Sequence, residues 1–245
     1  MPDGFGITLV YYPKEDMMNN VIINLTAAAA FVVAAVPALA GGLAPEPAPP
    51  VVVAPAPVMD WTGAYGGVLL GLGQGTYGNG TSFPGDGEGD WDGSLYGIAL
   101  GYNFQSGRMV YGGELTYSGA NIDGSEVCVN PAFQCMGEIS SIATLRGRVG
   151  YLAGPSTLIY GTAGFAMADL TFATDDGLGG GGQQSRNVNG YVVGLGFEQA
   201  ITERLNIRGA FLHYEFNDAT YQTDVPYTNV GGDLDQLELG VVFRF

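Results

Sequence analysis

The last stretch of the chain, Leu234–Phe245, alternates between two kinds of residue. In an extended strand one face is wholly apolar and the other carries Glu238 and Arg244; the first face is Leu237, Leu239, Val241, Phe243 and Phe245, and the second is Gln236, Glu238, Gly240, Val242 and Arg244. This period of two predicts a β-strand. An apolar face opposite a charged face is the pattern of a transmembrane barrel strand, which has lipid on one side and a packed polar interior on the other.

The composition agrees with a membrane wall and excludes one class of partner. Only 13% of the 245 residues are charged, which is about half the share usual in soluble domains. The formal net charge is −16, and Lys and Arg total 8, too few for the clustered basic surface that binds phosphate backbones. We therefore expect no nucleic-acid partner. Acidic residues gather between the expected strands, where they favour solubility or, alternatively, form an acidic rim that attracts divalent cations.

The N-terminal region reads as an export signal. Val21–Ala40 is an apolar run that ends in Ala-Leu-Ala, a small-x-small cleavage pattern. Residues 1–40 are therefore predicted to be a signal peptide, and the alternative of a permanent helical anchor is disfavoured by the proline and polar residues in the run. The segment before Met17 lacks the positive charge of a signal-peptide start, so Met17 or Met18 is an alternative first residue.

The rest of the chain divides into a linker and a folded domain. Residues 41–59 are rich in Pro and Ala, which predicts an extended periplasmic linker. Residues 60–245 contain about eight strand-like stretches, separated by long segments at Gln74–Asp92, Gly119–Gly137, Ala173–Arg186 and Asn217–Gly232 and by short turns at Gln105–Gly107, Gly154–Pro155 and Thr202–Glu203. Outer-membrane barrels have an even strand number, with short turns at one end and long loops at the other. We predict an all-β, eight-stranded antiparallel transmembrane up-and-down β-barrel.

The strand pattern also predicts which side chains face lipid. Expected lipid-facing residues include Ile98 and Leu100 on the second strand, Leu115 on the third, Ile139 and Leu145 on the fourth, Leu195 on the sixth and Phe211 on the seventh. Aromatic residues near the predicted strand ends are expected to form a girdle at the lipid–water boundary, namely Trp61, Tyr65, Trp91, Tyr96, Tyr111, Tyr117, Tyr151 and Tyr160. The facing of the fifth strand, Ser156–Phe172, is ambiguous because it is rich in Gly and Ala.

Charged residues fall on the opposite, inward faces. They are Glu114, Arg146, Arg148, Glu198, Arg208, Glu238 and Arg244. At the lipid face each would cost roughly 2–4 kcal/mol, and an eight-stranded barrel is just wide enough for its own side chains. We therefore expect these charges to pair and plug the lumen. They also argue against the alternative of a soluble lipocalin-like barrel, whose interior is apolar.

Several motifs make the chain resemble a known family. Trp61-x-Gly-x-Tyr65-x-Gly67, Leu158-x-Tyr160-Gly161, the Gly-rich alternating strands and the terminal Phe-x-Phe are similar to the small OmpA-like "porin family" barrels of alphaproteobacteria. The resemblance covers residues 60–245. It implies the outer membrane of a Gram-negative bacterium, outer-membrane lipid as surroundings, and insertion by the barrel-assembly machinery, which would read Phe243 and Phe245. It implies roles in envelope integrity and in surface interaction, with host or surface ligands as possible partners of acidic, Gly-rich outer loops, and no defined reaction.

Three other features bear on bonding and ligand chemistry. Cys128 and Cys135 are predicted to form a disulfide, because an exported protein with an even cysteine count favours one. No metal site is expected, because the chain has one His and a structural zinc needs four ligands. The segment from Gly73 to Gly78 matches Gly-x-Gly-x-x-Gly, but residues 79–85 are too rich in Gly and Pro to open the helix that a dinucleotide site requires, so no cofactor is expected.

His213 is the one candidate for catalysis. It is expected near the outer end of the seventh strand, with Glu215 on the same face. Some barrel enzymes modify lipid acyl chains with His, Ser and an acid, but no Ser lies beside His213 on its strand, and a nucleophile must lie within hydrogen-bond reach. We therefore expect a non-enzymatic structural and surface-interaction protein. The alternatives are a narrow diffusion channel and a lipid-modifying enzyme.

Overall fold

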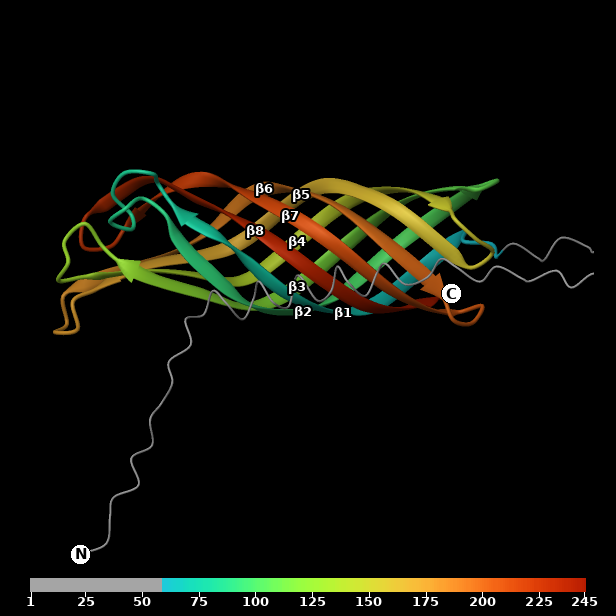
Figure 1. Cartoon of the computed structure of the whole chain (residues 1–245), viewed down its shortest axis with the longest axis horizontal. Helices are drawn as coiled ribbons and strands as arrows, with labels where there is room; N and C mark the ends of the chain where they lie inside the picture. Colours follow the sequence, from blue (N-terminus) through green and yellow to red (C-terminus); the bar gives the residue numbers. More distant parts are fainter. Residues whose placement is uncertain (1–58) are drawn as a thin grey trace, which may run out of the picture. The chain divides into compact units, whose positions relative to one another are not determined.

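Residues 59–245 are the part of the chain that the computed structural model describes. The predicted signal peptide, residues 1–40, and the predicted linker up to residue 58 lie outside it. The described residues form eight antiparallel strands that close into a barrel in sequence order (Figure 1): β1 (Gly63–Gly78), β2 (Gly89–Ser106), β3 (Met109–Val127), β4 (Gln134–Leu152), β5 (Thr157–Asp175), β6 (Gly181–Ala200), β7 (Leu205–Gln222) and β8 (Pro226–Arg244). β8 pairs with β1, so the sheet has no open edge. The predicted eight-stranded up-and-down barrel is confirmed.

The two ends of the barrel carry different connections. Short turns at residues 107–108, 153–156 and 201–204 lie at the end where β1 starts and β8 stops, which we call the turn end (Figure 1). The connections at residues 79–88, 128–133, 176–180 and 223–225 lie at the opposite, loop end. The predicted long connections were wrong in length, because strands of up to 20 residues run on into those segments. The strands therefore extend well beyond the roughly 9–11 residues that span a membrane.

A belt of exposed apolar side chains surrounds the barrel near the turn end. We define this apolar belt by Val68, Leu70 and Leu72 on β1; Tyr96, Ile98, Leu100, Tyr102 and Phe104 on β2; Tyr111, Leu115 and Tyr117 on β3; Leu145, Val149 and Tyr151 on β4; Ile159, Phe165 and Met167 on β5; Tyr191, Val193, Leu195 and Phe197 on β6; Ile207 and Phe211 on β7; and Leu237, Leu239, Val241 and Phe243 on β8. The alternation predicted for the last strand is confirmed. Soluble proteins do not expose an apolar surface of this extent, so the belt is the lipid-contacting part of the wall.

The chemical character of the two faces reverses between the belt and the loop end, while the in–out alternation of the strands continues. On β7, Phe211 is exposed and Arg208 buried in the belt, whereas Glu215 is exposed and Phe216 buried beyond it. We call the part beyond the belt the loop-end section, which comprises residues 74–94, 119–142, 169–189 and 213–235. Its outward-facing acids are Asp90, Asp92, Asp123, Glu138, Asp169, Glu215, Asp233 and Asp235. In the belt, the barrel therefore has lipid-facing walls around a polar core. In the loop-end section, it has water-facing walls around an apolar core.

One predicted lipid-facing residue points the wrong way. Ile139 on β4 is fully buried inside the barrel, whereas Leu145 on the same strand is exposed as predicted. The pairing of β4 with β5 shifts its register between Ile139 and Ser141, which marks a bulge. An extra residue moves every side chain before it to the opposite face, so the alternation could not be carried through this point from the sequence.

The predicted aromatic girdle is only half present. Tyr96, Tyr111, Tyr117 and Tyr151 are exposed on the wall, whereas Trp61, Tyr65, Trp91 and Tyr160 are buried inside the barrel. The prediction for the second group was wrong because it used the distance to a strand end and ignored the phase of the alternation. Aromatic rings in the inward phase fill the lumen instead of contacting the membrane boundary.

Candidate functional site

Glu114 on β3 is the centre of a buried charge network in the belt part of the interior. Its Oε1 accepts a hydrogen bond from Nη2 of Arg146 at 2.5 Å. Its Oε2 accepts hydrogen bonds from Nη1 of Arg208 at 2.5 Å and from the Tyr65 hydroxyl at 2.8 Å. Glu114 lies directly opposite Arg146 in the β3–β4 register, so the pairing of the strands itself brings the two charges together.

The remaining charges of the network are also paired. Nη2 of Arg208 donates to Oε1 of Glu238 at 2.8 Å, and Nη2 of Arg148 donates to Oε2 of Glu198 at 2.8 Å. Nδ2 of Asn206 donates to the other oxygen of Glu198 at 2.7 Å. The network thus contains three arginines and three glutamates, all buried, and has no net formal charge. Charge neutrality inside a low-dielectric barrel is what makes the burial of six ionised groups tolerable.

Arg244 was predicted to belong to this network, and the structure places it elsewhere. It lies at the turn end, where its Nη2 donates to the backbone carbonyl of Asp60 and its guanidinium sits 5.4 Å from the ring centre of Trp61. Six residues separate it from Glu238 along β8, a rise of about 20 Å. The alternation predicted its inward phase correctly, but the phase alone does not show which inward charges lie at the same level of the barrel.

The residues of the predicted assembly signal also lie at the turn end. Phe243 and Phe245 are both exposed, and their ring centres are 5.5 Å apart in an edge-to-face arrangement. The backbone N–H of Phe245 donates to the carbonyl of Ala64 on β1. Recognition of these two rings by the barrel-assembly machinery stays a prediction.

Packed aromatic side chains fill the interior of the loop-end section. Phe172 on β5 is fully buried, and its ring centre lies 4.7 Å from that of Tyr221, 5.4 Å from Phe83 and 5.7 Å from Tyr77. The Trp91 ring stacks on Phe172 with 6.2 Å between centres. The cluster continues through Ile122, Ile139, Leu170, Leu212, Phe216 and Leu234. This apolar plug was not predicted from the sequence, although the inward phase of β5 is apolar at Ala166, Ala168, Leu170 and Phe172.

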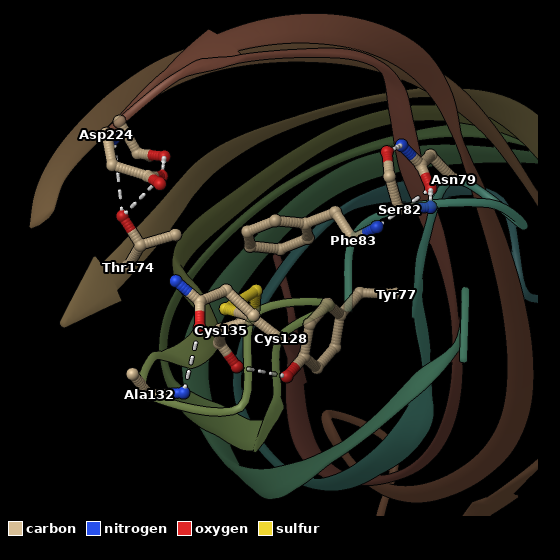
Figure 2. Close-up of a disulfide and its surroundings, with 11 residues drawn as sticks. Tyr77, Asn79, Ser82, Phe83, Cys128, Ala132, Cys135, Thr174 and Asp224 are labelled. Atoms are coloured by element: carbon tan, nitrogen blue, oxygen red, sulfur yellow. Dashed lines mark hydrogen bonds between the residues drawn. A yellow bond between two sulfur atoms is a disulfide. The ribbon is translucent and has the colours of Figure 1, made fainter. Parts of the chain in front are cut away.

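The connection between β1 and β2 folds over this plug. Figure 2 shows Asn79 beside Ser82 and Phe83. The side-chain Oδ1 of Asn79 accepts hydrogen bonds from the backbone N–H groups of Thr81 at 3.0 Å, Ser82 at 2.7 Å and Phe83 at 2.9 Å. These bonds fix a tight turn that directs the buried Phe83 ring onto Phe172.

Covalent and polar links hold the other connections at the loop end (Figure 2). Cys128 and Cys135 form a disulfide across the β3–β4 connection, with an S–S distance of 2.03 Å, and the Tyr77 hydroxyl donates to the Cys135 carbonyl at 3.0 Å. The Thr174 hydroxyl donates to Oδ1 of Asp224 at 3.0 Å, which ties β5 to the β7–β8 connection. Burial raises the pKa of Asp224, but the hydrogen bonds that it accepts hold the pKa below its usual value.

His213 lies on the outer wall, at the edge of the apolar belt nearest the loop end. Its Nδ1 is 2.8 Å from Oδ1 of Asp235, and its Nε2 is 3.8 Å from Oε2 of Glu215. The prediction that His213 lies near the end of its strand was wrong, because β7 continues to Gln222. Among residues 59–245, no Ser, Thr or Cys side chain is bonded to His213, so the nucleophile of an acyl-transfer triad is missing from its contacts.

The described residues show no other arrangement with an evident chemical role. Within residues 59–245, no group of three or more His, Cys, Asp or Glu side chains is placed to hold a metal ion. The Gly-x-Gly-x-x-Gly segment from Gly73 to Gly78 lies in β1 and is followed by a connection and another strand. Over the same part of the chain, no helix is long and apolar enough to cross a membrane.

Comparison with known proteins assigns the chain to a family. The family model described as outer membrane protein beta-barrel domain matches residues 26–245. The 22 kDa outer membrane protein of Rhizobium leguminosarum bv. viciae is 31% identical over 189 residues, which cover 75% of this chain and 79% of that protein. The 31 kDa outer-membrane immunogenic protein of Brucella melitensis biotype 1 is 28% identical over 183 residues, which cover 69% of this chain and 76% of that protein.

A solved structure shows the same fold. The crystal structure of the outer membrane protein OprG from Pseudomonas aeruginosa aligns with a TM-score of 0.51 and 12% sequence identity, covering 78% of this chain and 99% of that chain. The resemblance to alphaproteobacterial outer-membrane barrels is confirmed, and so is the location in the outer membrane of a Gram-negative bacterium. The chain belongs to the outer membrane protein beta-barrel domain family.

Proposed function

We propose that the protein is a closed, non-catalytic barrel that holds a rigid, acidic projection outside the outer membrane. In outer-membrane barrels the short turns face the periplasm and the longer loops face outward, which places the loop-end section outside the cell. In this role the barrel contributes to envelope integrity, and its loop-end section contacts surface or host ligands.

The observation that carries the proposal is the filling of the lumen at two levels. The neutral network around Glu114 occupies the belt, and the apolar plug around Phe172 occupies the loop-end section. Ions that pass the first level meet a buried aromatic cluster at the second, where their desolvation is costly. Two independent barriers support a closed barrel over a narrow diffusion channel.

The outer surface supports a role in surface contact. The loop-end section combines outward-facing acids with connections tied by the Cys128–Cys135 disulfide and the Thr174–Asp224 hydrogen bond. A rigid projection loses little conformational entropy when it binds a partner. The Brucella relative is named an immunogenic protein, which fits a surface that other molecules reach in the intact cell.

The lipid-modifying alternative has weaker support. Asp235 and His213 form the acid–base half of a triad, yet the contacts of His213 within residues 59–245 include no hydroxyl or thiol nucleophile. Without it, covalent acyl transfer has no acceptor on the protein.

Conductance in planar lipid bilayers tests the closed lumen. We expect the refolded wild-type chain, verified as a heat-modifiable band on gels, to produce no channel steps. The single variant Phe172→Ala should also stay silent, because the charge network still blocks the belt. Stable channel steps from the wild-type protein would remove the closed-barrel proposal in favour of a diffusion channel.

A further inference from the structure

A shallow hollow interrupts the lipid-facing wall over β4, β5, β6 and β7. Its volume is about 670 Å³, and its lining includes Gly147, Gly161, Ala163, Leu195, Phe211 and His213. The floor exists because small residues replace large ones. A Cβ atom added to Gly147 would find nothing nearer than 3.9 Å, and one added to Gly161 nothing nearer than 3.7 Å. Larger side chains at these positions would make the wall level with the rest of the belt.

The end of the hollow nearest the loop end of the barrel is polar. His213 lines it at the height where outward positions change from apolar to acidic. The hydrogen bond that Oδ1 of Asp235 accepts from Nδ1–H fixes the imidazole ring. Nε2 lies 3.8 Å from Glu215, beyond hydrogen-bond distance, and can bond to another group. Tyr191, half exposed, lies opposite Glu215 in the β6–β7 register. The hollow is thus lined mainly by small and apolar residues and ends at His213. Asp235 and Glu215 lie beside the imidazole, outside the lining of the hollow, with Tyr191 opposite Glu215.

We propose that this hollow holds one outer-leaflet glycolipid, with an acyl chain along the floor and a sugar headgroup at His213. The hollow is continuous with the apolar belt, whose surroundings are the bilayer, so its occupant is a lipid. Sugar hydroxyls donate hydrogen bonds to carboxylates such as Asp235 and Glu215, and a sugar ring can pack on Tyr191. A purely phosphate headgroup would be repelled by the same two carboxylates. The inference does not depend on whether the lumen is closed.

Native mass spectrometry of the full chain tests this site. The protein is solubilised in a detergent without a sugar headgroup and titrated with a diacylglycerol that carries an uncharged sugar headgroup, and with phosphatidic acid in a parallel series. We expect one glycolipid to be retained per barrel, about tenfold more tightly than the phospholipid. Ala163→Leu fills the floor and His213→Ala removes the polar end, and each should reduce glycolipid retention by about tenfold.

Ala64→Leu is the matched control, because Ala64 is an exposed alanine on β1, on the far side of the barrel order from β5. It should retain the glycolipid like the wild type. A heat-modifiable gel band for each variant establishes that the barrel is intact. Equal retention of both lipids, or glycolipid retention unchanged in Ala163→Leu and His213→Ala, would overturn the proposal. A wild-type dimer that Ala163→Leu abolishes would also overturn it, since the hollow would then be an interface between two copies.

Discussion

Glu114→Gln is expected to lower the free energy of unfolding by about 3–5 kcal/mol, the range for breaking a buried ion pair from one side. Glu114 accepts hydrogen bonds from Arg146, Arg208 and Tyr65, and the Arg148 guanidinium lies 4.0 Å from it. A neutral amide cannot balance these arginines, and the network of three positive and three negative groups becomes net positive in a water-poor interior.

Urea unfolding of the refolded protein in lipid vesicles measures this effect. The matched control is Glu138→Gln, since Glu138 is an exposed glutamate on the outward face of β4. We expect the control to change stability by less than about 0.5 kcal/mol. A loss for Glu114→Gln no larger than that of the control would show that the lumen network contributes little to stability.

Phe172→Ala is expected to lower the free energy of unfolding by about 3–5 kcal/mol, the range for removing a large ring from a packed core. Phe172 contacts Tyr77, Phe83, Trp91 and Tyr221, so its removal leaves a cavity shared by four aromatic neighbours. The cavity lies in the loop-end section, where water-facing walls surround the apolar plug.

Tryptophan fluorescence separates the two ends of the barrel in this experiment. The chain has 2 Trp residues, with Trp91 in the apolar plug and Trp61 buried at the turn end. In Trp61→Phe and Trp91→Phe backgrounds, Phe172→Ala should shift the Trp91 transition strongly and the Trp61 transition less. Thr171→Ala, an outward neighbour on β5, serves as the control, with a loss below about 1 kcal/mol. Equal stability of Phe172→Ala and the control would mean that the plug is not a packed core.

The belt was predictable from the sequence because lipid imposes a strict chemical rule on every outward position. On β8, the outward residues Leu237, Leu239 and Val241 alternate without interruption with inward residues that include Glu238. The facing of this strand and of its charged residue could therefore be predicted from the sequence. The same rule predicted Glu114 and Arg146 in the interior, whereas their direct pairing across β3 and β4 is set by the register, which the sequence analysis did not predict. The disulfide between Cys128 and Cys135 followed from the even cysteine count of an exported chain.

The loop-end section was less predictable because its rule is reversed and its signal is diluted. Small polar residues and acids occupy the outward positions there and Gly occupies many inward ones, so the segments after Phe172 and around Trp91 resembled loops. The sequence signal of the strands in the loop-end section is that inward positions become apolar where outward positions become acidic. The predictions for Ile139 and Arg244 were wrong for other reasons. A bulge shifts the phase of Ile139, and the inward phase of Arg244 did not show that it lies at the turn end, away from Glu238.

Quenching of Trp fluorescence by lipids with brominated acyl chains tests the reversal in chemical character of the two faces most directly. In the wild-type protein neither Trp61 nor Trp91 should be quenched, since both are buried inside the barrel. In a Trp-free background, Leu239→Trp in the belt should be quenched strongly, and Thr171→Trp on the wall above the belt should not. Quenching of Trp91, or of Thr171→Trp to the level of Leu239→Trp, would contradict a barrel whose lipid-facing wall ends below a water-facing section.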